Sequence, residues 1–316
     1  MKFRLGYVAI SLTLDEIDHF HTMTYSSYQK NNNQINITKL DDIINKNLDL
    51  LKLILEYNLI NQIYFYRISH HIIPLATHTK VRYDYINRFK DKYLEIGKII
   101  KKNNIRLDSH PDQFCVLNST KEEVVQNSKR ILNFNYKLFK ALNIKSKVVL
   151  HIGGSEISKQ DGIKRFKTNF LTLPPYIKKM IILENDDKIY NIVDTLELCE
   201  DLKIPMVLDY HHYLCNHEKE KLIDYLPRIY NTWQNTGLNP KVHFSSPKSK
   251  KEKRTHSTYI SLKGYLNFLN EIKQIPQDID IMLECKGKDE ALLRLSRQLI
   301  MTPGIKYINN STFEID

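Results

Sequence analysis

The sequence predicts a single (β/α)8 barrel, also called a TIM barrel, that spans residues 1–316. Three observations support this fold class. The chain contains eight short apolar runs rich in Ile, Val and Tyr, and amphipathic stretches of helix length separate most of them. Eight parallel strands are the number that closes such a barrel. A length of 316 residues is normal for one barrel, and no Pro-, Gly- or Ser-rich linker divides the chain.

The expected elements alternate along the chain. The strands are predicted at Arg4–Ile10, Gln62–Ser69, Ile105–His110, Lys147–Ile152, Met180–Asn185, Pro205–His212, Pro240–Ser246 and Asp280–Lys286. Helices are predicted where apolar residues recur at helical spacing, over Leu40–Tyr57, Tyr83–Lys102, Lys121–Leu142, Ile189–Leu202, Thr258–Ile272 and Ala291–Met301. This alternation predicts parallel strands whose carboxyl ends open at one common mouth.

The composition indicates a basic globular protein. Hydrophobic residues make up 42% and charged residues 26%, which excludes a disordered chain. No apolar run is long enough for a membrane span and the N-terminus lacks signal-peptide features, so we expect a cytoplasmic protein that does not contact membranes. The four widely spaced cysteines suggest neither a disulfide frame nor a thiolate zinc site. The net charge of +11 favours a polyanionic partner, nucleic acid first.

Most of the predicted strands end in a residue that can bind a metal ion. Buried strands should end in apolar residues unless the end has a chemical role, because an unpaired buried charge is costly. Here imidazoles and carboxylates occupy the strand ends or the loops that follow, at His78, His110, His151, Glu184, Asp209, His212, His243, His256 and Glu284. Because the carboxyl ends of barrel strands converge, we expect these side chains to meet in one pocket.

The types and number of these residues predict a cluster of metal ions. Imidazoles and carboxylates without thiolates suit Mn, Zn, Fe or Mg-like ions. One tetrahedral ion uses about four ligands, so nine candidate ligands predict two or three divalent ions. Bridging carboxylates would hold such ions about 3.5–4 Å apart, and Glu184 and Glu284 each follow three large apolar residues. Strand alternation favours His211 beside Asp209, but the strand is ending there, so the residues leave His211 and His212 open.

Lys241 is a third candidate catalytic residue beside Glu184 and Glu284. It lies two positions before His243 in a predicted strand, so both side chains face the same side. A lysine aimed at a cluster of cations would be repelled. Lys241 must therefore be neutral, lie outside the ligands of the ions, or be carboxylated into an acidic ligand, and the last is our hypothesis.

In their order and spacing these residues resemble the UV DNA damage endonuclease family. The stretches that carry the resemblance are Arg4–Tyr7, Tyr66–Ser69, Ile73–His78, His110–Phe114, His151–Gly154, Leu183–Asp186, Leu208–His212, Lys241–Ser246 and Met282–Glu284. The resemblance implies a DNA repair hydrolase that nicks duplex DNA immediately 5′ to UV photoproducts, both cyclobutane dimers and 6-4 products. It implies a cluster of divalent metals, most commonly manganese, with zinc or magnesium as alternatives. It also favours His212 over His211 as a ligand, and we expect a monomer.

The resemblance also implies residues that contact DNA carrying UV lesions. Gln113 and Phe114 match a pair that enters the duplex at the lesion, and Tyr7 matches a residue near the flipped bases. Ser11 stands where the family usually has an Asn that contacts the lesion region, which puts the lesion preference in doubt. Phe114 stands where Tyr is common, so it keeps an apolar wedge but lacks the hydroxyl.

A basic run after the seventh predicted strand is a further candidate for DNA contact. It covers Lys248–Arg254 and contains Lys248 and Lys250. Lysines in such a run are expected to contact phosphates, which makes binding sensitive to salt.

Three other functions fit part of the pattern. An abasic-site endonuclease with a three-metal barrel site shares the chemistry, but the Gln113–Phe114 loop together with Lys241–His243 favours the photoproduct enzyme. A sugar isomerase on a metal-binding barrel has little use for a charge of +11 or for nine ligands. A nucleic-acid-binding protein with a vestigial metal site would not be expected to keep candidate ligands at so many strand ends.

Overall fold

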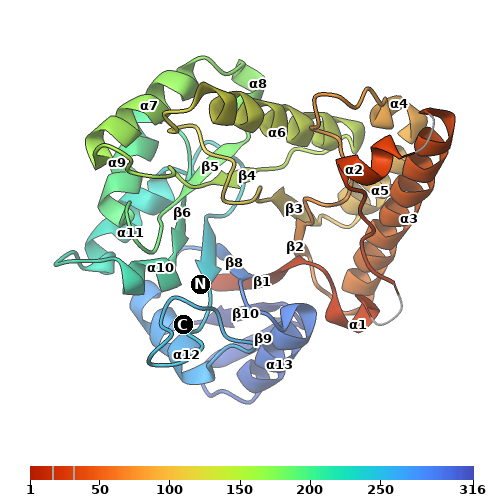
Figure 1. Cartoon of the computed structure of the whole chain (residues 1–316). Helices are drawn as coiled ribbons and strands as arrows, with labels where there is room; N and C mark the ends of the chain where they lie inside the picture. Colours follow the sequence, from red (N-terminus) through yellow and green to blue (C-terminus); the bar gives the residue numbers. More distant parts are fainter. Residues whose placement is uncertain (16–17, 31–32) are drawn as a thin grey trace.

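The computed structural model describes residues 1–15, 18–30 and 33–316, and it contains the expected closed barrel of eight parallel strands (Figure 1). From β2 to β8 each strand pairs with the next, β8 pairs with β1, and β1 pairs with β2 to close the ring. The strands are β1 Lys2–Ala9, β2 Phe65–Ile68, β3 Arg106–Ser109, β4 Val148–Leu150, β5 Ile181–Glu184, β6 Met206–Asp209, β7 Lys241–Phe244 and β8 Ile279–Leu283. The TIM-barrel prediction is confirmed.

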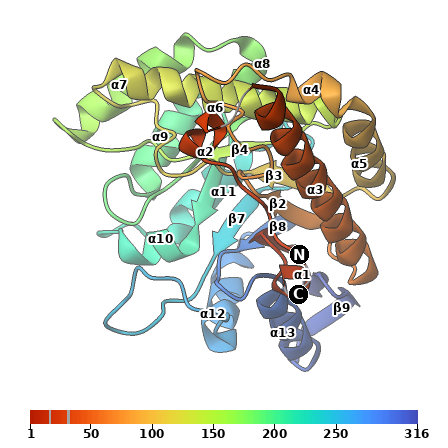
Figure 2. The same ribbon diagram turned by 45° about the vertical axis from the view of Figure 1, so that its right-hand side comes forward.

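Helices surround this barrel on its outside (Figures 1 and 2). The longer ones are α3 Asn33–Ile60, α5 Lys90–Lys102, α6 Glu122–Ala141, α7 Lys159–Leu171, α9 Ile192–Leu202, α11 Leu222–Asn231, α12 Leu262–Ile272 and α13 Lys288–Ile300. Short helices are α1 Leu12–Asp15, α2 Tyr25–Gln29, α4 Tyr85–Arg88, α8 Pro175–Lys178 and α10 Tyr210–Cys215. The helices α7 and α11 were not predicted from the sequence pattern. Among the described residues, no helix combines the length and hydropathy that crossing a bilayer requires.

The strands are shorter than predicted at their carboxyl ends, because the chain turns there to form the mouth. The sixth strand was predicted to reach His212, but it ends at Asp209. The Asp209 carboxylate accepts a hydrogen bond of 2.7 Å from the backbone N–H of His212 and so begins α10. Similarly, β7 ends at Phe244 and β8 at Leu283. Several candidate ligands therefore lie on the first residues after a strand, where a side chain can turn into the mouth.

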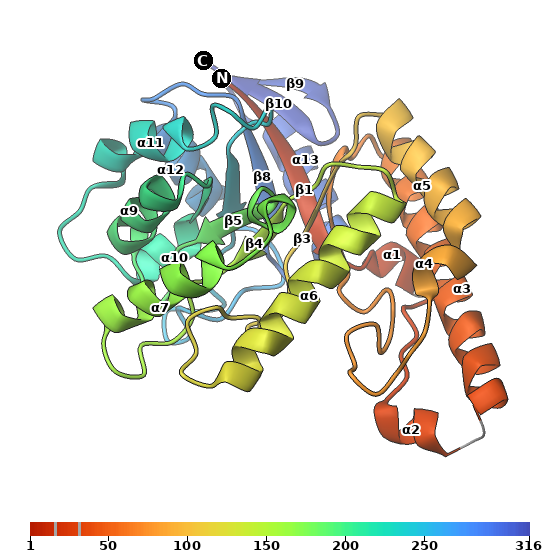
Figure 3. The ribbon, with the colours of Figure 1, turned by 90° about the horizontal axis from the view of Figure 1, so that it is seen from above.

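A C-terminal hairpin that the sequence analysis did not predict completes the other end of the barrel. It consists of β9 Ile305–Asn309 and β10 Thr312–Ile315. The strand β10 pairs antiparallel with the start of β1, where Phe3 lies opposite Phe313 and the two rings stack at 5.6 Å. Only the later part of β1, from Tyr7 onward, pairs with β2. The hairpin therefore pairs with the first part of β1, and β2 pairs with the later part. Figure 3 shows the hairpin far from α2.

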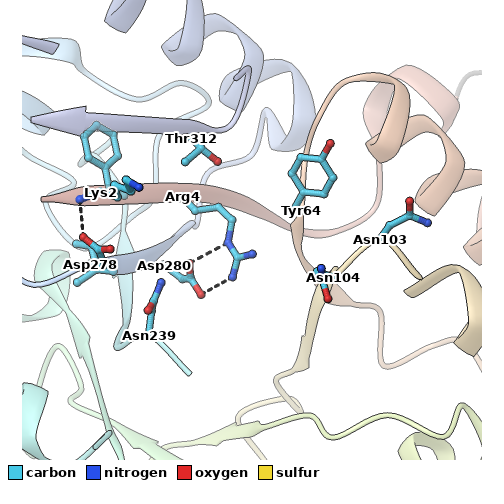
Figure 4. Close-up of a pocket in the computed structure, with 11 residues that line it drawn as sticks. Lys2, Arg4, Tyr64, Asn103, Asn104, Asn239, Asp278, Asp280 and Thr312 are labelled. Carbon is cyan, nitrogen blue, oxygen red and sulfur yellow. Dashed lines mark hydrogen bonds and ion pairs between the residues drawn. The ribbon is translucent and has the colours of Figure 1, made fainter. Parts of the chain in front are cut away.

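Charged side chains fill the amino end of the barrel. The Arg4 guanidinium donates two hydrogen bonds, of 2.9 and 2.6 Å, to Asp280 (Figure 4). Arg106 donates to Asp280 at 2.8 Å and to Asp108 at 3.2 Å. A cavity of about 380 Å³ next to Arg4 and Asp278 opens at this end. It lies at the beginnings of the strands, so it is separate from the mouth that carries the candidate ligands.

Candidate metal centre

One buried carboxylate lies at the centre of the mouth. Glu184 is the last residue of β5, and the strand's buried apolar residues leave it 1% exposed. Its two oxygens face four imidazoles. The Oε2 atom is 3.1 Å from His110 Nε2 and 3.7 Å from His151 Nε2. The Oε1 atom is 2.9 Å from His243 Nδ1 and 3.5 Å from His212 Nδ1.

The ligand atoms form two groups that share this carboxylate. In each group the atoms lie within 4.8 Å of one another. The first group contains His110, His151 and Glu184, and the second contains Glu184, Asp209, His243 and Glu284. A carboxylate common to two groups is the arrangement that a bridging ligand needs. The structure therefore brings together six of the nine predicted ligands, from the ends of six different strands.

Unpaired buried atoms show that the site suits cations. Within the described part of the chain, Asp209 Oδ2 and His243 Nε2 are buried without a hydrogen-bond partner. Glu184 Oε1 and His243 Nδ1 lie 2.9 Å apart but form no hydrogen bond of normal geometry. Buried polar groups almost always have a partner, so such a set of unsatisfied atoms calls for another species. Imidazole nitrogens and carboxylate oxygens are the donors that Mn, Zn, Fe or Mg-like ions accept. The residues present thus fit divalent ions, without selecting one metal.

Neighbouring backbone groups orient the candidate ligands. His110 Nδ1 is 2.9 Å from the carbonyl oxygen of Pro111, and His212 Nδ1 is 2.9 Å from that of Asn185. The Asn185 side chain donates to the Asp209 carbonyl and accepts from the Asp209 N–H, at 3.0 and 2.9 Å. Outer contacts of this kind fix ring orientation in metal sites. Asn185 follows Glu184 directly, and its orienting role was not predicted from the sequence.

Burial and mutual charge shift the protonation of these groups in opposite directions. Burial alone would raise the pKa of Glu184, but His243 and His151 hold this pKa well below its usual value. Burial raises the pKa of Asp209 well above its usual value. Burial also lowers the pKa of His110 to about 4. Burial would lower the pKa of His212, but Asp209 and then Glu184 raise it to about 9. Without ions, the centre therefore holds a proton on His212.

Gln113 and Phe114 open onto a groove that reaches the metal centre. The groove has a volume of about 880 Å³, and His151 and His212 form part of its wall. Phe114 is 67% exposed, and its backbone N–H donates to the Asp112 carboxylate at 2.8 Å. Because this exposed ring lies in the wall of a groove, it is accessible to a ligand that enters the groove. The predicted lesion-contacting pair and two predicted ligands thus share one surface.

Three predicted ligands lie outside the two groups. The His78 ring stacks on Tyr25 of α2 at 3.9 Å, and its Nδ1 accepts from the backbone of Lys80. The His256 ring lies 6.3 Å from the ring of His212, at the edge of the centre. His212 itself lies near both Glu184 and Asp209, but its atoms belong to neither group. His211 was the alternative to His212 as a ligand. Its ring lies 5.2 Å from the ring of His256.

The other residues predicted to contact DNA divide into buried and exposed ones. Tyr7 is fully buried, and its hydroxyl donates to Asn58 of α3 at 2.8 Å. Ser11 is 2% exposed and donates to Asp289 at 2.8 Å. Neither side chain is presented to solvent in this conformation. By contrast, Lys248 and Lys250 are exposed, and Lys248 pairs with Glu252 on the same loop.

Lys241 is buried on β7 on the same side as His243, as the spacing predicted. Its Nζ lies 3.4 Å from Asp108 of β3, and burial lowers the pKa of the amine to about 8. Asp108 was missed by the sequence analysis, although it precedes His110 by two positions and so shares its side of the strand. Arg67 was also missed, and its guanidinium donates to the Glu284 carboxylate. No local sequence signal identifies this second pair.

Comparison with known proteins gives consistent matches over the whole chain. A family model described as UV-endonuclease UvdE matches residues 3–316. A UV DNA damage endonuclease from Bacillus thuringiensis subsp. konkukian is 42% identical, and the alignment covers 99% of this chain and 100% of the relative. The crystal structure of SacUVDE superposes with a TM-score of 0.83 at 33% identity, covering 95% of this chain and 100% of that one.

A more distant structure shares the fold alone. Endonuclease IV from Thermus thermophilus has a TM-score of 0.53 at 12% identity, and the match covers 93% of this chain and 98% of that one.

Proposed function

Because this chain belongs to the UV-endonuclease UvdE family, we propose that it is a metal-dependent repair endonuclease that nicks duplex DNA immediately 5′ to UV photoproducts. The observation that carries the proposal is the position of Glu184, shared by two ligand groups beside a groove edged by Gln113 and Phe114. We further propose that residues 1–316 act as a single catalytic domain and as a monomer.

The mouth residues would hold two or three divalent ions, for which manganese is our first candidate. When bound, such ions neutralise the phosphate, lower the pKa of a bound water and stabilise the leaving oxygen. Glu184 would bind between two positions, and His110 and His151 would complete one of them. Asp209, His243 and Glu284 would complete the other. His212, His256 and His78 would join after a movement of their side chains.

Lys241 would act beside this centre. Its lowered pKa of about 8 leaves part of the amine uncharged near neutral pH, and an uncharged amine can react with carbon dioxide. The nitrogen would bond to the carbon and release a proton, giving a carbamate that supplies carboxylate oxygens. This carboxylation is our hypothesis for how a buried lysine contributes to a cationic centre.

The groove would take up the distorted duplex. A damaged, poorly stacked dinucleotide costs less to extrude than normal bases, which supplies part of the selectivity. Phe114 would stack in the vacated space while Gln113 makes polar contacts. The exposed Lys248 and Lys250 would contact phosphates outside the groove.

The direct test is nicking of a duplex that carries one defined cyclobutane dimer, with matched undamaged and abasic duplexes, in the presence of Mn²⁺. We expect one cut immediately 5′ to the dimer, which Glu184→Ala abolishes. Cutting of only the abasic duplex would assign the chain to the abasic-site alternative. Cutting of none of the three would refute the proposed activity. A Phe114→Ala variant should lose discrimination between damaged and undamaged DNA while keeping its bound metal.

A further inference from the structure

Arg67 lies at the edge of the metal centre but is not one of its ligands. It belongs to β2, its side chain is 15% exposed, and its Nη1 donates to Glu284 Oε1. Glu284 is also 3.1 Å from His243, so it is shared between Arg67 and the ligand cluster. Arg67 is therefore fixed by a member of the centre and sits in contact with it.

The guanidinium has hydrogen-bonding capacity that the protein leaves unused. An arginine side chain carries five N–H donors. Among the residues that the structure describes, the contact with Glu284 is the only hydrogen bond that the Arg67 guanidinium makes. The remaining donors are not among the buried unpaired atoms, which agrees with the partial exposure of this side chain at the mouth. These donors are available to a ligand that enters the mouth.

A second cation, Lys288, interacts electrostatically with the same carboxylate. Lys288 is half-buried at the start of α13. Burial, and then the positive charge of Arg67, lowers the pKa of Lys288. Arg67 and Lys288 thus both contribute positive charge to the surroundings of Glu284. A guanidinium matches the oxygens of a phosphate group better than an ammonium does, because its planar fork donates two parallel hydrogen bonds.

We propose that Arg67 binds a non-bridging oxygen of a substrate phosphate at the rim of the metal centre, with Glu284 holding its guanidinium in place. Lys288 adds positive charge on the same side. The inference rests on the proposed endonuclease function and names the residue that grips the phosphodiester. A purely positioning role for Arg67, which would orient Glu284 for metal binding, makes different predictions for metal content and phosphate affinity.

The test compares Arg67→Met and Arg67→Lys with the native protein after loading with Mn²⁺. Metal content is measured by inductively coupled plasma mass spectrometry. Binding of inorganic phosphate is measured by isothermal titration calorimetry. We expect unchanged metal content and a phosphate Kd about ten- to hundredfold weaker in Arg67→Met, the range for losing a charged hydrogen bond. Arg67→Lys should restore part of the affinity, because it keeps the charge without the fork.

The matched control is Arg228→Met. Arg228 also pairs with a carboxylate, Glu200, but on the outer helices. It should alter neither metal content nor phosphate affinity. Steady-state hydrolysis of a nitrophenyl phosphodiester should show a raised inhibition constant for phosphate in Arg67→Met. If Arg67→Met does not fold, Arg67→Lys replaces it in the comparison with the native protein. This variant retains an ion pair with Glu284 and should still bind phosphate more weakly than the native protein.

Two results would overturn the inference. One is native phosphate affinity in a metal-loaded Arg67→Met protein. The other is loss of metal with unchanged phosphate affinity per loaded site, which would establish the positioning role. This test is independent of the proposed lesion specificity, because inorganic phosphate contains no lesion. A protein that ignores dimer-containing DNA but binds phosphate through Arg67 would refute only the lesion assignment.

Discussion

Replacing Glu184 by Gln tests whether one carboxylate serves both ligand groups. The substitution keeps the size of the side chain but removes its charge and one of its two acceptor oxygens. In the native chain these oxygens lie 2.9–3.7 Å from four imidazole nitrogens. A neutral amide cannot bridge two cations, so at least one ion should be lost. Stabilisation by a metal ion is worth several kcal/mol, and a loss of about 4 kcal/mol corresponds to a rate reduction of about 10³-fold.

The assay combines metal analysis with nicking of the dimer-containing duplex. Glu156→Gln is the matched control, because Glu156 is an exposed glutamate that lines the same groove without belonging to either ligand group. We expect the control to keep its ions and its activity. A Glu184→Gln protein that keeps all its ions, and nicks within about tenfold of the native rate, would refute the shared-ligand reasoning.

Three further predictions concern charge. In protein kept free of metal ions and carbon dioxide, where Lys241 is not carboxylated, Asp108→Asn leaves the buried Lys241 ammonium without its counter-charge. We therefore expect a loss of about 3–5 kcal/mol in the free energy of unfolding, measured with urea; unchanged stability would indicate an uncharged Lys241. Because His212, with a pKa of about 9 in the ion-free protein, must lose its proton to bind an ion, metal affinity should rise about tenfold per pH unit up to about pH 9 if His212 becomes a ligand. Calorimetry showing pH-independent affinity between about pH 7 and 9 would contradict this. Replacing Lys248 and Lys250 by Gln should weaken binding of damaged and undamaged duplex alike, and reduce the salt slope by about one unit per lysine; an unchanged slope would remove them from the interface.

Candidate ligands at the ends of strands were predictable because the fold itself determines their position. A closed parallel barrel places the ends of β3, β4 and β5 side by side, so His110, His151 and Glu184 had to approach one another once the strands were identified. The positions of His78 and His256 could not be predicted in this way, because both residues lie on loops. Loop conformation depends on contacts that periodicity does not encode, such as the stacking of His78 on Tyr25.

The missed residues are those whose partners are remote in the sequence. Arg67 and Glu284 are separated by 217 positions, and nothing near either residue identifies the other. Their contact follows from the closure of the barrel, which brings β2 and β8 to either side of β1. The C-terminal hairpin was missed for a different reason. Its first strand, β9, has no buried residue, and the alternation of β10 extends over only four residues, too few to identify a strand from sequence.

The buried charges inside the barrel form a continuous series that ends at the metal centre. Asp280 contacts Arg106, Arg106 contacts Asp108, and Asp108 contacts Lys241, whose charge also acts on Glu184. Buried ion pairs rarely stabilise a fold more than apolar residues of the same volume would. A barrel that needed only stability would therefore fill these positions with aliphatic side chains. We infer that this series of alternating charges, which begins at the amino end of the barrel, sets the charge state of Lys241. The Asp108→Asn variant should therefore change both the free energy of unfolding and the chemistry at the mouth.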